Sequence, residues 1–148
     1  MTTTVEPVET PCVCATLRMA TRAVARLYDR ALEPHGLRTT QYSILARLEV
    51  EGPAAVGQLA ARLAMDRTTL AREAAPLVEA GLVEEAPGED RRSRVLALTP
   101  KGLERLETAR PAWREAQRQV RNELGYDRVQ ELLGELRALL GAARTAAT

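Results

Sequence analysis

The stretch from Val56 to Gly81 constrains the fold of this chain more than any other. Two short runs of apolar residues at three- and four-residue steps predict two amphipathic helices. Only Ala64 and Met65 separate the first helix from Asp66, a residue type suited to cap the second. Gly81 then suits the position just beyond the second helix. Two short helices joined so tightly predict a helix-turn-helix motif.

Two short apolar segments follow this motif. Residues 82–86 and 95–99 are predicted to form strands, because Leu96 and Leu98 alternate with smaller residues. The polar segment between them, residues 87–94, is long for the loop of a plain hairpin. Beside a helix-turn-helix motif, two strands with a long polar loop indicate a wing.

Longer helices are predicted on both sides of this region. Thr10-Pro11 and Thr99-Pro100 each combine a capping residue with a proline at the first helical position. The first helix should end at Pro34-His35-Gly36, and a second should begin at Thr39 or Thr40. Asp127 is predicted to cap a last helix with an apolar stripe from Val129 to Leu140. The predicted fold class is mainly α, with a small β-hairpin wing.

Composition limits the classes of protein that remain. The 148 residues are 45% hydrophobic and 28% charged, as expected of one globular domain. A single histidine, His35, and two cysteines are too few for a zinc finger or a multi-histidine metal site, so no metal or other cofactor is expected. The net charge of +1 excludes a polybasic nucleic-acid coat but not a small basic face. Without a bilayer-length apolar run or a signal-peptide pattern, we expect a cytoplasmic protein with no membrane partner.

The order of elements and three motifs resemble the MarR family of bacterial transcription regulators. The motifs are QLAARLAMDRTTLAR at 58–72, GLV at 81–83 and DRRSRVLALTPKG at 90–102. The resemblance covers the chain from about Cys14 to Leu140.

This resemblance implies a specific organisation and function. A flexible N-terminus at 1–10 should precede a winged helix-turn-helix region at 37–99, flanked by long dimerisation helices at 11–36 and 100–144. The family binds double-stranded DNA as a homodimer at pseudo-palindromic sites, so a repressor is expected. Binding of a small-molecule effector, or oxidation by a peroxide, should then release the DNA.

The chemistry of the second motif helix independently favours DNA reading. The residues at the start of such a helix point toward base edges in the major groove. Arginine can bond guanine through two nitrogens, and threonine can contact a base, a phosphate or a thymine methyl group. The candidate residues are Arg67, Thr68, Thr69 and Arg72. Alternatively, the two arginines are solvated and pair with Glu73 or Glu79. Glu73 itself should repel phosphate unless it pairs with Arg72 or accepts from a cytosine amine.

The wing supplies a second basic group, Arg91, Arg92 and Arg94. An arginine inserted into a narrow minor groove reads its shape and electrostatic potential. The resemblance implies that Arg92 is the minor-groove residue and that Asp90 holds it through an ion pair. Arg91 and Arg94 are expected either to contact phosphate or to stay solvated. Six arginines and seven acidic residues lie between Arg62 and Arg94, so nonspecific affinity should be modest.

Cys12 and Cys14 are the candidate signal-sensing residues. Both fall near the start of the first helix, where the helix dipole favours the reactive thiolate. The spacing from Cys14 to Gln41-Tyr42 resembles the branch of the family that senses organic hydroperoxides. That resemblance implies oxidation of Cys14 to a sulfenic acid, with Tyr28 as a supporting residue. Cys12 could then form a disulfide with the oxidised Cys14. Small-ligand sensing and inert thiols stay open, whereas a Cys-x-Cys metal pair would need partners from another chain.

Two other classes of function compete with a DNA-binding regulator. A thiol peroxidase would use Cys14, but the sequence positions no base for it. Paired carboxylates, a Ser-His-Asp set and a phosphate loop are also missing from the sequence, so we do not expect an enzyme. A helical protein-binding adaptor without DNA binding would fit the near-neutral wing region and the Glu84-Glu85 pair. Salt-sensitive binding to a defined duplex would exclude the adaptor.

Overall fold

Helices make up most of the structure, a computed structural model that describes residues 11–90 and 92–148. In chain order the elements are α1 (Val13–Leu32), the 3-10 helix η1 (Glu33–His35), α2 (Thr39–Glu51), β1 (Ala54–Ala55), α3 (Val56–Arg62), α4 (Arg67–Glu79), β2 (Val83–Pro87), β3 (Arg94–Leu98), α5 (Pro100–Leu124) and α6 (Tyr126–Ala146). This composition, with one small antiparallel sheet, confirms the predicted fold class.

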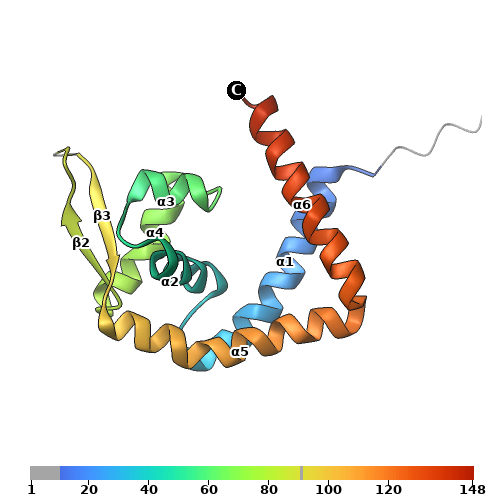
Figure 1. Cartoon of the computed structure of the whole chain (residues 1–148), viewed down its shortest axis with the longest axis horizontal. Coiled ribbons are helices and arrows are strands. Elements are labelled where there is room, and N and C mark those ends of the chain that lie inside the picture. The colour runs from blue at the N-terminus through green and yellow to red at the C-terminus, as the bar shows by residue number, and fades with distance from the viewer. Residues whose placement is uncertain (1–10, 91) are drawn as a thin grey trace, which may run out of the picture.

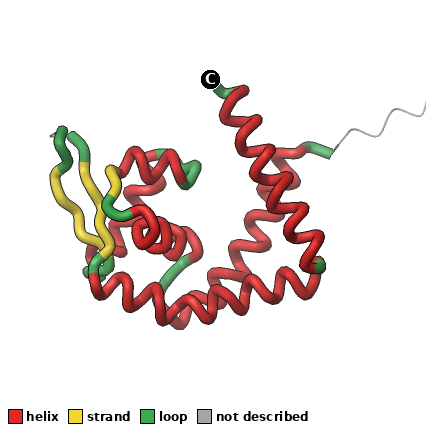
Figure 2. Tube along the Cα trace, viewed as in Figure 1, coloured by secondary structure: helices red, strands yellow, loops and turns green. Residues whose placement is uncertain are grey.

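Helix α5 connects two arms of the molecule (Figure 1). One arm holds α2, α3, α4 and the strands, and the other holds α1 and α6. Figure 2 shows that the strands lie at one outer edge of the first arm. Across the two described ranges, no helix has both the length and the apolar character needed to span a membrane.

The helix-turn-helix motif forms where the sequence predicts it. Ala64 turns the chain between α3 and α4 with a φ of 53°, in the left-handed region that L-residues seldom adopt. The Met65 amide donates to the Ala60 carbonyl at 2.8 Å, which closes the end of α3. The two helices join the core through side chains that are at most 2% exposed, namely Leu59, Leu70 and Leu77.

The sheet has three strands in the order β1-β3-β2. Val83 pairs with Leu98, and Pro87 pairs with Arg94, so the wing loop covers residues 88–93 and is shorter than predicted. Strand β1 was not predicted from the sequence, and it pairs Ala54 with Leu96. Because β1 leads directly into α3, this pairing holds the start of a helix that has no side-chain cap.

Helix α5 begins as predicted and packs on α2. The Thr99 hydroxyl accepts the Gly102 N–H at 2.9 Å. Trp113 is partly buried and stacks on the core residue Tyr42 with 5.5 Å between ring centroids. Arg110 Nη2 donates to both carboxylate oxygens of Glu49 at 2.9 Å. These contacts fix α5 against the arm that carries the wing.

Two predicted helix caps need correction. The first helix is capped by Cys12, whose Sγ accepts the Ala15 N–H at 3.4 Å, while the predicted cap Thr10 lies outside the described residues. Gly125, with a φ of 97°, precedes α6, so Asp127 lies inside the first turn and does not cap it. Gly125 adopts a positive φ, which ends α5 and changes the direction of the chain within one residue. Helix α6 then begins at Tyr126, so Asp127 is already helical and cannot take the extended conformation of a cap.

The apolar stripes of α1 and α6 are only partly covered. Within one chain, Val24 of α1 is 43% exposed. Four leucines of α6 are between 36% and 44% exposed, namely Leu132, Leu136, Leu139 and Leu140. Exposed apolar side chains gathered on helix faces in this way are typical of interaction surfaces.

Candidate nucleic-acid interface

Asp66 organises the exposed start of α4. Its carboxylate accepts the Thr69 backbone N–H at 2.7 Å. This hydrogen bond lowers the pKa of Asp66, so the capping group is ionised at neutral pH. Its negative charge interacts favourably with the positive end of the helix dipole. The cap thereby fixes the first turn of the helix, whose predicted contact residues are exposed or half-exposed: Arg67, Thr68, Thr69 and Arg72.

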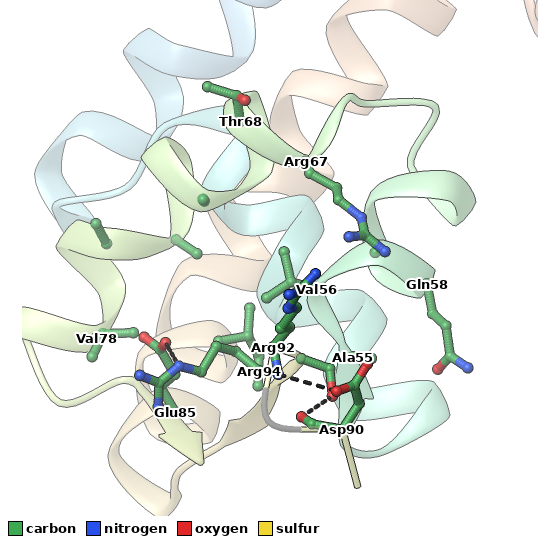
Figure 3. A pocket seen from close by; sticks show the side chains of 16 residues that line it. Ala55, Val56, Gln58, Arg67, Thr68, Val78, Glu85, Asp90, Arg92 and Arg94 are labelled. Carbon is green, nitrogen blue, oxygen red and sulfur yellow. Dashed lines mark hydrogen bonds and ion pairs between the residues drawn. The ribbon is translucent and has the colours of Figure 1, made fainter. Parts of the chain in front are cut away.

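A groove of about 610 Å³ lies between α4, the start of α3 and the wing (Figure 3). Its apolar part comes from small side chains of α4 together with Val56 and Leu96. The groove brings together predicted residues from the helix and from the wing, namely Arg67, Thr68, Asp90, Arg92 and Arg94. Thr69 and Arg72 do not line it. Since 3.6 residues make one turn, Arg72 lies roughly 140° around the helix from Arg67.

Arg67 extends toward the start of α3 (Figure 3). A Cβ atom added to Gly57 would come within 2.9 Å of three atoms of the Arg67 guanidinium. Because Gly57 has no Cβ, the Arg67 guanidinium can occupy this position beside it. Among the described residues, neither Arg67 nor Arg72 forms the ion pair with Glu73 or Glu79 that was considered as an alternative.

The wing loop is closed by hydrogen bonds of Asp90. Its carboxylate accepts the Arg92 backbone N–H at 3.3 Å, and its carbonyl accepts from the Ser93 N–H and hydroxyl, both at 2.9 Å. The Gly88 N–H donates to the Ser93 carbonyl at 2.9 Å. Asp90 therefore stabilises the turn by bonding backbone groups. An aspartate in a turn commonly accepts the backbone N–H of the residue two positions further along the chain.

The predicted Asp90–Arg92 ion pair is wrong for the part of the wing that the structure describes. The short Asp90 side chain is engaged with the backbone, and the exposed Arg92 guanidinium makes no ion pair there. Arg94 pairs with Glu85 across the two strands at 3.4 Å, which offsets part of its charge. Arg91, the remaining predicted wing residue, lies outside the described residues.

Glu73 has partners that the sequence analysis did not identify. Nη2 of Arg38 lies 2.6 and 2.7 Å from its two carboxylate oxygens, and the Thr40 hydroxyl donates at 2.9 Å. Glu73 therefore pairs with Arg38 and not with Arg72, which was considered as an alternative. No local pattern could reveal Arg38, because it lies 35 residues away in sequence.

The thiols of Cys12 and Cys14 are both exposed at the start of α1. Tyr28 lies near the other end of this helix, and its hydroxyl donates to the Gln117 side chain on α5. Burial raises the pKa of Tyr28, and nearby Arg121 opposes that shift. At 1.5 Å per residue, Tyr28 lies about 21 Å along the helix from Cys14. Within one chain the structure does not bring this predicted pair together.

Comparison with known proteins decides the family. A sequence profile of the MarR family matches residues 35–93. The transcriptional regulator MosR of M. tuberculosis, solved in complex with DNA, is 38% identical with a TM-score of 0.77. That similarity covers 90% of this chain and 99% of MosR. The chain belongs to the MarR family.

Two further relatives agree with this assignment. The HTH-type transcriptional regulator YwoH of Bacillus subtilis is 30% identical over 91 residues, which span 62% of the chain and 66% of YwoH. MarR itself from E. coli shares the fold, with a TM-score of 0.71 at 23% identity over 89% of the chain and 99% of MarR. As a MarR-family transcriptional regulator, the chain carries its helix-turn-helix and wing beside one groove.

Proposed function

We propose that the chain is a homodimeric repressor that binds a pseudo-palindromic operator in double-stranded DNA. Helix α4 enters the major groove, and the wing enters the adjacent minor groove. The two half-sites lie about one helical turn of DNA apart. We propose no enzymatic activity.

One observation carries this proposal. The capped start of α4 and the closed wing loop present Arg67 and Arg92 on the same groove, and Arg72 is exposed on the next part of the helix surface. This is the juxtaposition needed to read two neighbouring grooves of a duplex. The DNA complex of MosR, a relative that is similar over 90% of this chain, supports the same partner.

The homodimer is supported by the exposed apolar faces of α1 and α6. We propose that residues 11–36 and 100–144 form the dimerisation region and that residues 37–99 form the DNA-binding region. Helix α5, the first helix of 100–144, starts beside the wing and ends at α6, so the dimerisation region follows the DNA-binding region directly. A change at the dimer interface can therefore alter the spacing of the two reading helices.

Arginine variants on a labelled duplex test the DNA-binding proposal. The duplex is selected from a random-sequence pool by the wild-type chain, and a scrambled duplex serves as reference. Arg72→Ala should weaken binding to the selected duplex about tenfold and reduce discrimination between the duplexes. Arg92→Ala should weaken binding and lower the salt dependence by about one counterion.

Arg118→Ala is the matched control, since this exposed arginine of α5 pairs with Glu115 far from the groove. It should bind both duplexes as the wild type does. Equal losses for all three arginine variants would contradict the assignment of α4 and the wing as the reading surface.

We propose thiol oxidation as the signal that releases the DNA. The Cys14 thiolate attacks a hydroperoxide oxygen, which yields a sulfenic acid while the peroxide is reduced to an alcohol. The Cys12 thiol then displaces water and forms a disulfide. Because the Cys12 Sγ accepts the Ala15 N–H, a bond to Cys14 of the same chain requires the first turn of α1 to open. A bond to the partner subunit avoids that cost if the two helices cross.

One equivalent of an organic hydroperoxide tests this signal. Reduced protein on the selected duplex should lose affinity after treatment and regain it with a thiol reductant, and Cys14→Ser should not respond. Cys12→Ser should stop at the sulfenic acid, which intact-protein mass spectrometry distinguishes from a disulfide. DNA binding that survives oxidation of Cys14 would exclude this signal.

A small anionic ligand is the second candidate signal. A cavity of about 390 Å³ lies where α1 meets the start of α2, and three of its lining residues are arginines, namely Arg26, Arg30 and Arg38. Asp29 and Glu33 also line it, and Arg38 is paired with Glu73, so Arg26 and Arg30 are the arginines that would bind a carboxylate ligand there. Release of DNA by aromatic or aliphatic carboxylates from the fully reduced protein would favour this candidate over oxidation.

A further inference from the structure

The start of α2 makes polar contacts with two other helices. From α1, the Asp29 carboxylate accepts the Thr39 backbone N–H at 2.7 Å. From α4, the Glu73 carboxylate accepts from Arg38 and from the Thr40 hydroxyl. Three consecutive residues thus connect a helix of the proposed dimerisation region to the helix that faces DNA.

Glu73 lies at the border between the buried and exposed faces of α4. Its side chain is 14% exposed, whereas that of Arg38 is 61% exposed. A carboxylate this far from water needs hydrogen-bond partners, and here Oε2 has two of them. Because hydrogen bonds to an ionised group are directional, these contacts oppose rotation of α4 about its axis in addition to the leucine contacts of its buried face.

We propose that Glu73 is a positioning residue of the DNA-reading helix. Held by Arg38 and Thr40, it fixes the rotation of α4 and thus the direction in which Thr68 and Arg72 face the base edges. This inference rests on the proposed function, since it concerns how the same surface reads DNA.

A different role for Glu73 predicts the opposite result. If this carboxylate were only a negative charge near the phosphates, removing it would raise affinity for every duplex. If it positions α4, removing it lowers affinity for the selected duplex and leaves affinity for a scrambled duplex unchanged or raised. Selectivity, the ratio of the two affinities, therefore separates the roles.

The first test uses the full-length dimer without DNA. Amide hydrogen exchange should increase roughly threefold or more in peptides that cover residues 67–75 of Glu73→Gln and of Arg38→Ala. Glu79→Gln, an exposed position on the same helix, is the control and should exchange as the wild type does. Unchanged exchange in both Glu73→Gln and Arg38→Ala would overturn the positioning role. A thermal melt of each variant identifies any that has lost its fold.

The second test measures selectivity by fluorescence anisotropy on the selected and scrambled duplexes. Glu73→Gln should lose about tenfold in selectivity, close to the effect of one good base contact. The double variant Arg38→Glu with Glu73→Arg restores the ion pair with reversed charge and should recover selectivity relative to Arg38→Glu alone. A gain in affinity of Glu73→Gln for both duplexes would overturn the proposal.

The two tests separate this inference from the proposed function. If the wild-type chain prefers no duplex, the DNA-binding proposal fails, and hydrogen exchange still decides whether Glu73 holds α4. If the wild type is selective and Glu73→Gln is equally selective with unchanged exchange, only the positioning role is overturned.

Discussion

Gly102 has a hydrogen atom where other residues carry a Cβ, and this allows Leu82 and Leu98 to pack closely against the start of α5. A Cβ added there would collide with the Leu82 carbonyl oxygen and would come within 2.8 Å of Leu98 Cδ1. The first of these atoms is backbone, so it cannot move aside as a flexible side chain would. The glycine of the 90–102 motif is therefore explained by packing rather than by contact with DNA.

We expect Gly102→Ala to lower the free energy of unfolding by about 3 kcal/mol through overpacking. Gly141→Ala is the control, because within one chain nothing lies within 4 Å of the Cβ it would add. That substitution should leave stability unchanged or raise it by up to about 1 kcal/mol. Urea unfolding at one fixed protein concentration measures both, since dimerisation contributes to stability. Equal stability of the two variants would contradict this packing argument.

Ala64 is the one non-glycine residue with positive φ in the described part of the chain. The left-handed conformation costs an L-residue roughly 1 kcal/mol or more, which glycine does not incur. Ala64→Gly should therefore stabilise the chain, by about 0.5 kcal/mol after the larger entropy of the unfolded glycine is subtracted. Ala61→Gly, placed in α3, should instead destabilise it, and a lower urea midpoint for Ala64→Gly would contradict the strain argument.

At the scale of single elements, the cap of α4 should respond to pH. Asp66 has a lowered pKa because its carboxylate accepts the Thr69 N–H, so its stabilising effect is fully present above the unfolded value of 3.8. The effect is lost as the pH falls below that value toward the lower pKa of the folded state. The wild type should thus be more stable than Asp66→Asn at neutral pH, and the two should converge in acid. A constant difference between their urea midpoints from neutral to acidic pH would contradict this role.

The helix-turn-helix and the long helices were predictable because their signals are local. Asp66, Gly81 and Thr99 stand at fixed offsets from apolar runs, and all three lie at the predicted helix ends. Strand β1 was not predictable, because two alanines form a strand only when β3 supplies the partner. The same reason hid the Arg38–Glu73 pair, in which tertiary packing joins residues distant in sequence.

The candidate site was predicted in composition but less well in its contacts. Five predicted residues line one groove, because the sequence pattern locates both the start of the second motif helix and the wing. Asp90 instead bonds backbone groups, and the choice between backbone and guanidinium depends on the shape of the turn rather than on residue type. The predicted relation between Cys14 and Tyr28 stays a prediction, because about 21 Å of helix separates the two residues within one chain.

At the scale of the whole molecule, the exposed leucines of α6 predict an obligate dimer. Leu136→Arg should convert the chain to a monomer, or unfold it, because a buried unpaired charge disfavours the interface. Val50→Arg is the control, since Val50 is 81% exposed and lies on α2, outside the proposed dimerisation region. Sedimentation at several concentrations measures the assembly, and a dimeric Leu136→Arg would show that α6 is not the interface.

Because α5 joins the reading arm to the proposed dimerisation arm, we expect sequence-specific DNA binding to be a property of the whole dimer. The most direct test is anisotropy of the reduced wild-type protein on the selected and scrambled duplexes at about 50 and 200 mM salt. We predict roughly hundredfold or tighter binding to the selected duplex and weaker binding to both at the higher salt. Equal affinity for the two duplexes, or affinity that salt does not change, would contradict the proposal that α4 and the wing read DNA.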